Sequence, residues 1–299
     1  MLGTGYTLLT TERALMMAPD VGEAAGDIFE VGAGRVDELS SELVGFVGPV
    51  RRIVALGGGR VIDTAKALAA VREPRRRAMV AAVPTTLSAA EMTAIHRRAA
   101  HSDTSLPGAR PAIVVNDPAL SASQPLAELA ASAANSLAHA AEGPATVRAS
   151  PIPVMAGREA ARLTREAYAG GGDEPDRDML ALAALLSGYT IDSAGYGLHH
   201  VLSQTLARFA GVGHGPANAV MLPHTLVALE RRGAPGAGDL VELATDLARR
   251  AEAVSLRALG VDEAALETCV DAASDRAELD AIPPRPDRDE LRALYAAAY

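Results

Sequence analysis

Short apolar runs alternate with amphipathic helical patterns over the first 118 residues. The strand-like runs cover positions 6–11, 27–32, 51–59, 78–86 and 111–117. Helical patterns lie between them, in ERALMM, RVDELSSELVGFV and RVIDTAKALAAV. Continuous apolar strands separated by helices indicate a parallel sheet covered on both faces. We therefore expect an α/β domain over residues 1–118, with a doubly wound, Rossmann-like sheet.

The pattern changes after position 118, where strand signals stop. Long Ala- and Leu-rich helical patterns follow at 125–143, 153–169, 178–195, 198–210 and 239–259. Apolar residues repeating at three and four positions are typical of helices that bury one face. The sequence therefore predicts an all-helical second domain over residues 119–299.

Composition and charge exclude several function classes. The formal net charge is -9, whereas a nucleic-acid interface needs clustered Lys and Arg. No stretch of about 20 apolar residues occurs, so we expect no membrane span. The N-terminus lacks the pattern of a signal peptide, and the single cysteine, Cys269, allows no internal disulfide. We expect a cytoplasmic protein that acts on a small-molecule substrate and binds neither nucleic acid nor a membrane.

Three consecutive glycines, Gly57, Gly58 and Gly59, join a predicted strand to a predicted helix. Glycine permits close approach of the backbone to a ligand, and a helix N-terminus attracts anions. The turn therefore suits a pyrophosphate, although a tight turn used only for packing remains the alternative. The segment VPTTLSAAEMT follows a second strand and places hydroxyl groups at the edge of the sheet where ligands bind.

Four of the seven histidines lie between Gly197 and His224, and His139 lies four residues after Asn135. Several imidazoles that converge suit a divalent metal, whereas an isolated histidine is more often structural. Spacing alone leaves both interpretations open.

Several motifs in the same order resemble the iron-containing (group III) alcohol dehydrogenase superfamily, closest to its maleylacetate reductases. They are GGGRVIDTAK, VPTTLSAAEMT, NSLAHAAEG and GLHHVLSQTLARFAGVGHGPANAVMLPH. The resemblance covers roughly residues 50 to 299 and implies a dehydroquinate synthase-like fold, a nicotinamide cofactor and a homodimer. The chain starts at what looks like the family's second strand, so we expect the family's opening strand and its glycine-containing turn to be absent.

The resemblance also assigns residues to roles, as expectations. The cofactor-binding set is Gly57, Gly58, Gly59, Asp63, Thr85, Thr86 and Ser88. The metal set is Asn135, His139, His200 and His214, for Fe²⁺ or Zn²⁺. The catalytic set is His199, His200, His214 and Gln204, with His199 matching the doubled histidine of maleylacetate reductases.

Two departures from the family pattern weaken these assignments. Asn135 stands where the family has an aspartate, and a neutral amide oxygen is a weaker metal ligand. Gln204 stands where the family has a histidine implicated in proton relay, and glutamine exchanges no proton near neutral pH.

The leading hypothesis is an NAD(P)H-dependent reductase of a small, anionic carbonyl or enoic-acid substrate bound between the domains. A metal-bound or protonated His200 or His214 would stabilise the developing negative charge, and an imidazolium-lined pocket would favour an anion. NAD and NADP are not distinguished. The alternative is a non-redox lyase, cyclase or isomerase that uses the histidines for acid–base chemistry.

Overall fold

The computed structural model describes residues 2–47, 50–100, 102–103, 105–234 and 236–299. The chain divides into two compact units, Met1–Gln124 and Pro125–Tyr299. The division falls after Gln124 rather than after position 118, because Leu120 of a short 3₁₀ helix (Pro118–Ser123) is buried in the core of the first unit. None of the helices in the described residues combines the length and apolar character needed to cross a bilayer.

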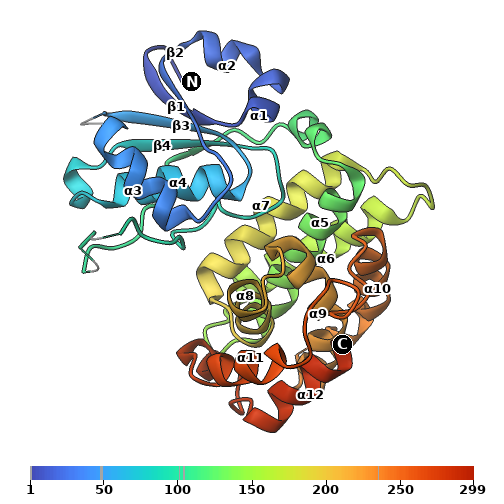
Figure 1. The fold of residues 1–299 in the computed structure, drawn as a ribbon. Coiled ribbons are helices and arrows are strands. Elements are labelled where there is room, and N and C mark those ends of the chain that lie inside the picture. The colour runs from blue at the N-terminus through green and yellow to red at the C-terminus, as the bar shows by residue number, and fades with distance from the viewer. Residues whose placement is uncertain (1, 48–49, 101, 104, 235) are drawn as a thin grey trace. The chain divides into compact units, whose positions relative to one another are not determined.

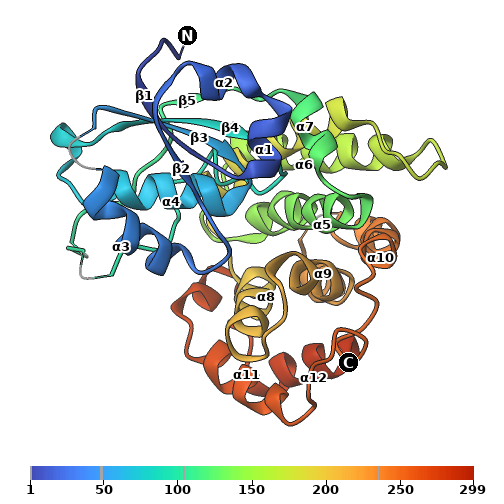
Figure 2. The same cartoon turned by 45° about the horizontal axis from the view of Figure 1, so that its top comes forward.

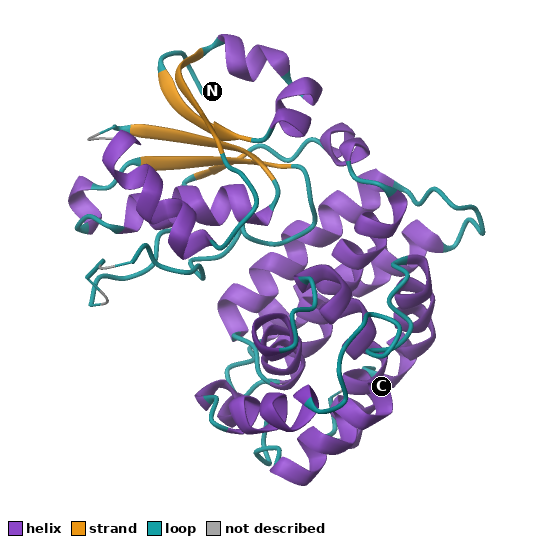
Figure 3. Cartoon of the chain, viewed as in Figure 1, coloured by secondary structure: helices purple, strands orange, loops and turns teal. Residues whose placement is uncertain are grey.

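The first unit contains a five-stranded parallel sheet (Figures 1 and 3). Its strands are β1 (Tyr6–Thr10), β2 (Ala25–Glu30), β3 (Arg52–Gly57), β4 (Met79–Pro84) and β5 (Ile113–Val114). The strand order is β2-β1-β3-β4-β5, so the direction of winding reverses between β1 and β3. In open α/β sheets, ligands bind beyond the carboxyl ends of the strands at such a reversal.

Helices cover both faces of this sheet. They are α1 (Glu12–Met17), α2 (Pro19–Glu23), α3 (Val36–Val47) and α4 (Gly59–Ala70). Alternate residues of one strand point to opposite faces, so Ile53 and Ala55 pack with α3 and α4. Their neighbours Val54 and Leu56 pack on the side of α1 and α2. The expected doubly wound sheet is confirmed.

The described residues of the second unit form helices and loops, which confirms the expected helical character (Figure 3). The helices are α5 (Leu126–Glu142), α6 (Pro151–Tyr168), α7 (Arg177–Ala194), α8 (Leu198–Phe209), α9 (His214–Arg231), α10 (Val241–Arg250), α11 (Ala265–Ser274) and α12 (Arg288–Ala298). Helix α5 packs against α6, α7, α9 and α10 (Figure 2). This central position explains why α5 is buried over most of its length.

Three helices of the second unit differ from the sequence prediction, among them α12, which was not predicted. Helix α9 was not predicted; it begins at His214 and continues through Pro223, although proline removes one backbone donor. The helix expected over 239–259 ends at Arg250. There Glu252 adopts a left-handed conformation, with φ of 55°, and the Ala253 N–H bonds back to the Ala248 carbonyl. This pairing is the Schellman arrangement that terminates helices.

Candidate functional site

The glycine turn connects β3 to α4 in the first unit. Gly58 is the N-cap of α4 and supplies no side chain to satisfy the first N–H groups of the helix. A Cβ on Gly58 would lie 2.9 Å from Thr86 Cγ2, and a Cβ on Gly59 would lie 2.9 Å from both Cβ and Oγ of Ser88. The turn therefore needs glycine for packing, and the same packing leaves the helix N-terminus without a side-chain cap.

The hydroxyl-bearing segment after β4 lies against this turn. The Thr85 N–H donates to the Gly57 carbonyl at 3.1 Å, which fixes the two loops together. Thr86 Oγ1 is buried and has no hydrogen-bond partner. A buried hydroxyl without a partner, beside uncapped helix N–H groups, is typical of a site that an external polar group completes.

Asp63 faces an internal cation. Its carboxylate accepts from Lys66 Nζ at 2.8 Å, and the Lys66 side chain is fully buried. Lys66 Nζ also donates to the carbonyls of Ala90 and Ile95, at 2.9 and 2.7 Å. These contacts fasten α4 to the loop after β4, so Asp63 takes part in holding that loop in place. Its direct contact with a cofactor stays a prediction.

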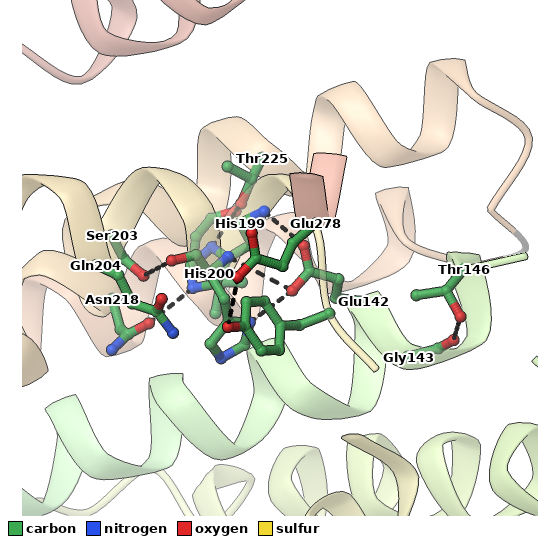
Figure 4. A network of polar contacts seen from close by, with 12 residues as sticks. Glu142, Gly143, Thr146, His199, His200, Ser203, Gln204, Asn218, Thr225 and Glu278 are labelled. Atoms are coloured by element: carbon green, nitrogen blue, oxygen red, sulfur yellow. Dashed lines mark hydrogen bonds and ion pairs between the residues drawn. The ribbon is translucent and has the colours of Figure 1, made fainter. Parts of the chain in front are cut away.

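Three histidines gather in the second unit, and Figure 4 shows His199 and His200 among their polar partners. The His139 and His200 rings stack with centroids 4.6 Å apart, and the His199 ring meets His200 edge-on at 5.0 Å. Helix α5 supplies His139, and the first turn of α8 supplies the other two. The sequence-predicted residues on these helices therefore do come together.

Glu142 orients His200. His200 Nδ1 donates to Glu142 Oε2 at 2.5 Å, and the His199 backbone N–H donates to Oε1 at 2.6 Å. Glu142 is fully buried, and its carboxylate sits where the positive end of the α8 dipole stabilises it. With its proton fixed on Nδ1, His200 presents the lone pair of Nε2, an atom that is buried and has no partner.

Both ring nitrogens of His199 have hydrogen-bond partners. Its Nδ1 lies 2.8 Å from Thr225 Oγ1 and its Nε2 lies 3.0 Å from Asn218 Oδ1. The side chain is fully buried. This arrangement fits a residue that fixes α8 against α9, and the expected catalytic role of His199 stays a prediction.

His214 is exposed and begins helix α9. Its Nε2 lies 3.2 Å from Asn218 Nδ2, and the same amide nitrogen donates to the His214 carbonyl at 2.8 Å. Asn218 therefore bridges His214 and His199 through the two ends of one amide.

The donor set offered to a metal is incomplete. Asn135 Oδ1, His139 Nδ1 and His200 Nε2 are buried without partners, whereas His214 Nε2 is engaged by Asn218. Across the described part of the chain, no three His, Cys, Asp or Glu side chains converge as metal ligands do. A four-coordinate metal site needs a fourth free ligand atom besides these three. The four-residue metal set stays a prediction, and we assign no chemical step to a metal.

Burial decides the charge of the imidazoles. It lowers the pKa of His199 and of His200 to about 3, and it holds the pKa of His139 well below the usual value. At neutral pH these rings are therefore uncharged. This argues against the imidazolium-lined pocket expected from the sequence, because burial disfavours a positively charged ring.

Gln204 lies one helical turn beyond His200, in a polar group with Tyr196, Arg276 and Glu278. Gln204 Oε1 accepts from Arg276 Nη2 at 3.1 Å. The Tyr196 hydroxyl donates to Glu278 Oε1 at 3.1 Å, and the Tyr196 ring lies 5.7 Å from that of His200. The position of the family's relay histidine is thus filled by an amide held by an arginine.

Sequence reasoning gave no role to Glu142, Asn218, Thr225 or Arg276. Glu142 stands three residues after His139 in the quoted NSLAHAAEG motif, and that spacing places both on one face of α5. Asn218 carried the equivalent signal, four residues after His214. Arg276 carried no signal, because its partner Gln204 is 72 positions away.

Two family models match the chain. The model described as Fe-containing alcohol dehydrogenase family, C-terminal, matches residues 129–299. The model described as iron-containing alcohol dehydrogenase matches residues 48–118.

Individual relatives agree with these matches. A maleylacetate reductase of Pseudomonas aeruginosa is 32% identical over 271 residues, which span 83% of this chain and 73% of the relative. The crystal structure of a maleylacetate reductase from a Rhizobium species superimposes with a TM-score of 0.81 at 27% identity. That superposition covers 99% of this chain and 89% of the other. The corresponding enzyme from Agrobacterium tumefaciens gives a TM-score of 0.80 at 26% identity, with the same coverage.

Proposed function

This chain belongs to the iron-containing alcohol dehydrogenase family, a family of oxidoreductases, and we propose that it is an NAD(P)H-dependent reductase of a small, anionic carbonyl or enoic-acid substrate. The observation that carries the proposal is the cradle formed by Gly58, Gly59, Thr86 and Ser88 at the uncapped N-terminus of α4. The relatives are named as reductases and dehydrogenases, so the non-redox alternative is not favoured.

The cradle's chemistry fits a dinucleotide. Backbone N–H groups at the start of α4 would donate to the pyrophosphate, and the glycines let it approach closely. The buried Thr86 hydroxyl would gain the partner that it lacks. A bound reduced nicotinamide would supply the hydride.

The imidazole cluster would orient the substrate. Glu142 fixes the His200 tautomer whose Nε2 carries a lone pair, so this atom would accept a hydrogen bond from a protonated group rather than donate one to the substrate carbonyl. The Gln204 amide can hydrogen-bond a neighbouring group, but it cannot exchange a proton near neutral pH. A proton relay through this position is therefore excluded. His139 and His200 are buried, so a substrate bound against them would be shielded from water.

The relatives' names point to maleylacetate as the first substrate to test. It carries carboxylates and a carbonyl, which agrees with the anionic class inferred from the sequence. A homodimer stays a prediction.

Calorimetric titration with NADH and NADPH tests the cofactor assignment. We expect binding of at least one nucleotide, and a Gly59→Ala variant should bind about tenfold more weakly, since a methyl group would collide with Ser88. Gly45→Ala on α3 is the matched control, because a Cβ there meets no atom within 4 Å. Maleylacetate-dependent oxidation of the reduced nucleotide tests the activity. Failure of the wild-type chain to bind either nucleotide would refute the proposal.

A further inference from the structure

Arg276 lies beside the imidazole cluster of the second unit, on the segment that follows α11. Its Nη2 donates to Gln204 Oε1 at 3.1 Å and lies 3.4 Å from the Tyr196 hydroxyl. Both partners border His200, because Gln204 is one turn further along the same face of α8 and the Tyr196 ring tilts against the His200 ring. A single side chain, that of Gln204 or of Tyr196, therefore separates the guanidinium from His200.

A carboxylate holds this guanidinium in a fixed plane. Glu278 accepts from Arg276 Nε at 3.0 Å and from Nη2 at 2.6 Å, as a two-point ion pair. Such forked pairs define orientation as well as attraction. The Tyr196 hydroxyl donates to Glu278 Oε1, the oxygen that also accepts from Arg276 Nη2. The carboxylate is therefore itself held in place.

One edge of the guanidinium is left open. Nη1 has no hydrogen-bond partner among the described residues, and the Arg276 side chain is 30% exposed. Arginine remains charged at any physiological pH. The positive charge beside the cluster therefore does not depend on protonation of an imidazole.

A purely structural ion pair is the competing interpretation. It would explain the Arg276–Glu278 pairing, which fastens the segment before α12. It does not explain why the guanidinium also holds Gln204, which borders the imidazole cluster. A guanidinium edge that is held in a fixed plane and left open points to a negatively charged ligand that would accept from it.

We propose that Arg276 is a specificity-determining residue that binds a carboxylate of the substrate through its open Nη1 edge, while Glu278 and Gln204 position the guanidinium. The proposal rests on the function proposed above in treating this carboxylate as part of a substrate. It gives a physical reason for an anionic substrate.

Titration of two probes, maleate and its uncharged diamide, tests this role. Both are titrated into the wild-type chain with saturating NAD⁺ and again without nucleotide. We expect the wild type to bind maleate about tenfold more tightly than the diamide, and Arg276→Gln to remove that preference. Arg276→Lys should retain part of it, because the charge remains while the forked geometry is lost.

Arg208→Gln is the matched control, since Arg208 lies on the exposed end of α8 and contacts the Phe209 ring. It should keep the full preference for maleate. Equal binding of the two probes by the wild type, or an unchanged preference in Arg276→Gln, would overturn the proposal. If Arg276→Gln does not fold, the ratio of maleate to diamide binding is measured on Arg276→Lys instead. A ratio equal to that of the wild type would count against the proposal. Failure of the reductase assignment appears separately, as absence of nucleotide binding.

Discussion

Replacing Glu142 by glutamine tests how the cluster is held together. The Glu142 carboxylate accepts three donors of the first turn of α8: the His199 N–H at 2.6 Å, His200 Nδ1 at 2.5 Å and the His200 N–H at 3.4 Å. Glutamine has nearly the same shape, but it is neutral and one oxygen becomes an NH₂ group. If the remaining oxygen stays on the His199 N–H, the NH₂ group meets the Nδ1–H of His200, donor against donor.

The magnitude follows from these contacts. A hydrogen bond to a charged group contributes about 1.5–3 kcal/mol, and a buried donor left unpaired costs about 1–3 kcal/mol. Part of this loss is offset because a neutral amide is easier to bury than a carboxylate. We expect the free energy of unfolding to fall by about 2–3 kcal/mol. We also expect His200 to move its proton to Nε2, so that Nδ1 accepts from the amide.

Two measurements check this prediction. Urea denaturation gives the stability, and ¹⁵N NMR of labelled histidine gives the tautomer of His200. Glu166→Gln is the matched control, because Glu166 forms an exposed pair with Arg162 on α6, and losing such a pair should leave the stability nearly unchanged. Unchanged stability together with an unchanged tautomer would refute the reasoning. Lower stability with the original tautomer would mean that Glu142 only caps α8 and does not fix the tautomer of His200.

Three further predictions concern other buried or charged groups. Lys66→Met should lower the free energy of unfolding by about 3 kcal/mol in urea denaturation, because it leaves buried carbonyls without their donor; a change below about 0.5 kcal/mol would contradict this. Asn135→Asp should raise the iron or zinc retained per chain, measured by elemental analysis after dialysis, because it adds an anionic oxygen; equal metal in both chains would count against a site there. Arg276 lowers the pKa of Glu278 from 4.5 to about 2, so the carboxylate contributes stability above pH 4.5 that is lost as the pH falls towards 2. Glu278→Gln should therefore flatten the acid limb of the stability curve between these values, and an acid limb identical to that of the wild type would be inconsistent with the pairing.

The fold was predictable because its signals are local. The apolar runs around Val54 and Val80 predict buried parallel strands, and the glycines at 57–59 predict the turn between a strand and a helix. Helix α9 was missed because His214, Gly215 and Pro223 weaken the local pattern, whereas its buried face against α5 and α8 stabilises it.

The sequence by itself determined which side chains were available: three glycines at one turn, an amide at a predicted metal-ligand position, and histidines spaced for helix faces. Tertiary structure decided what those side chains do. Glu142 reaches His200 across 58 positions, and Arg276 reaches Gln204 across 72, because helix packing brings them together where no periodicity could. Burial, which exists only in the folded chain, disfavours the charged form of the His199 and His200 imidazoles, whereas the Arg276 guanidinium stays positive.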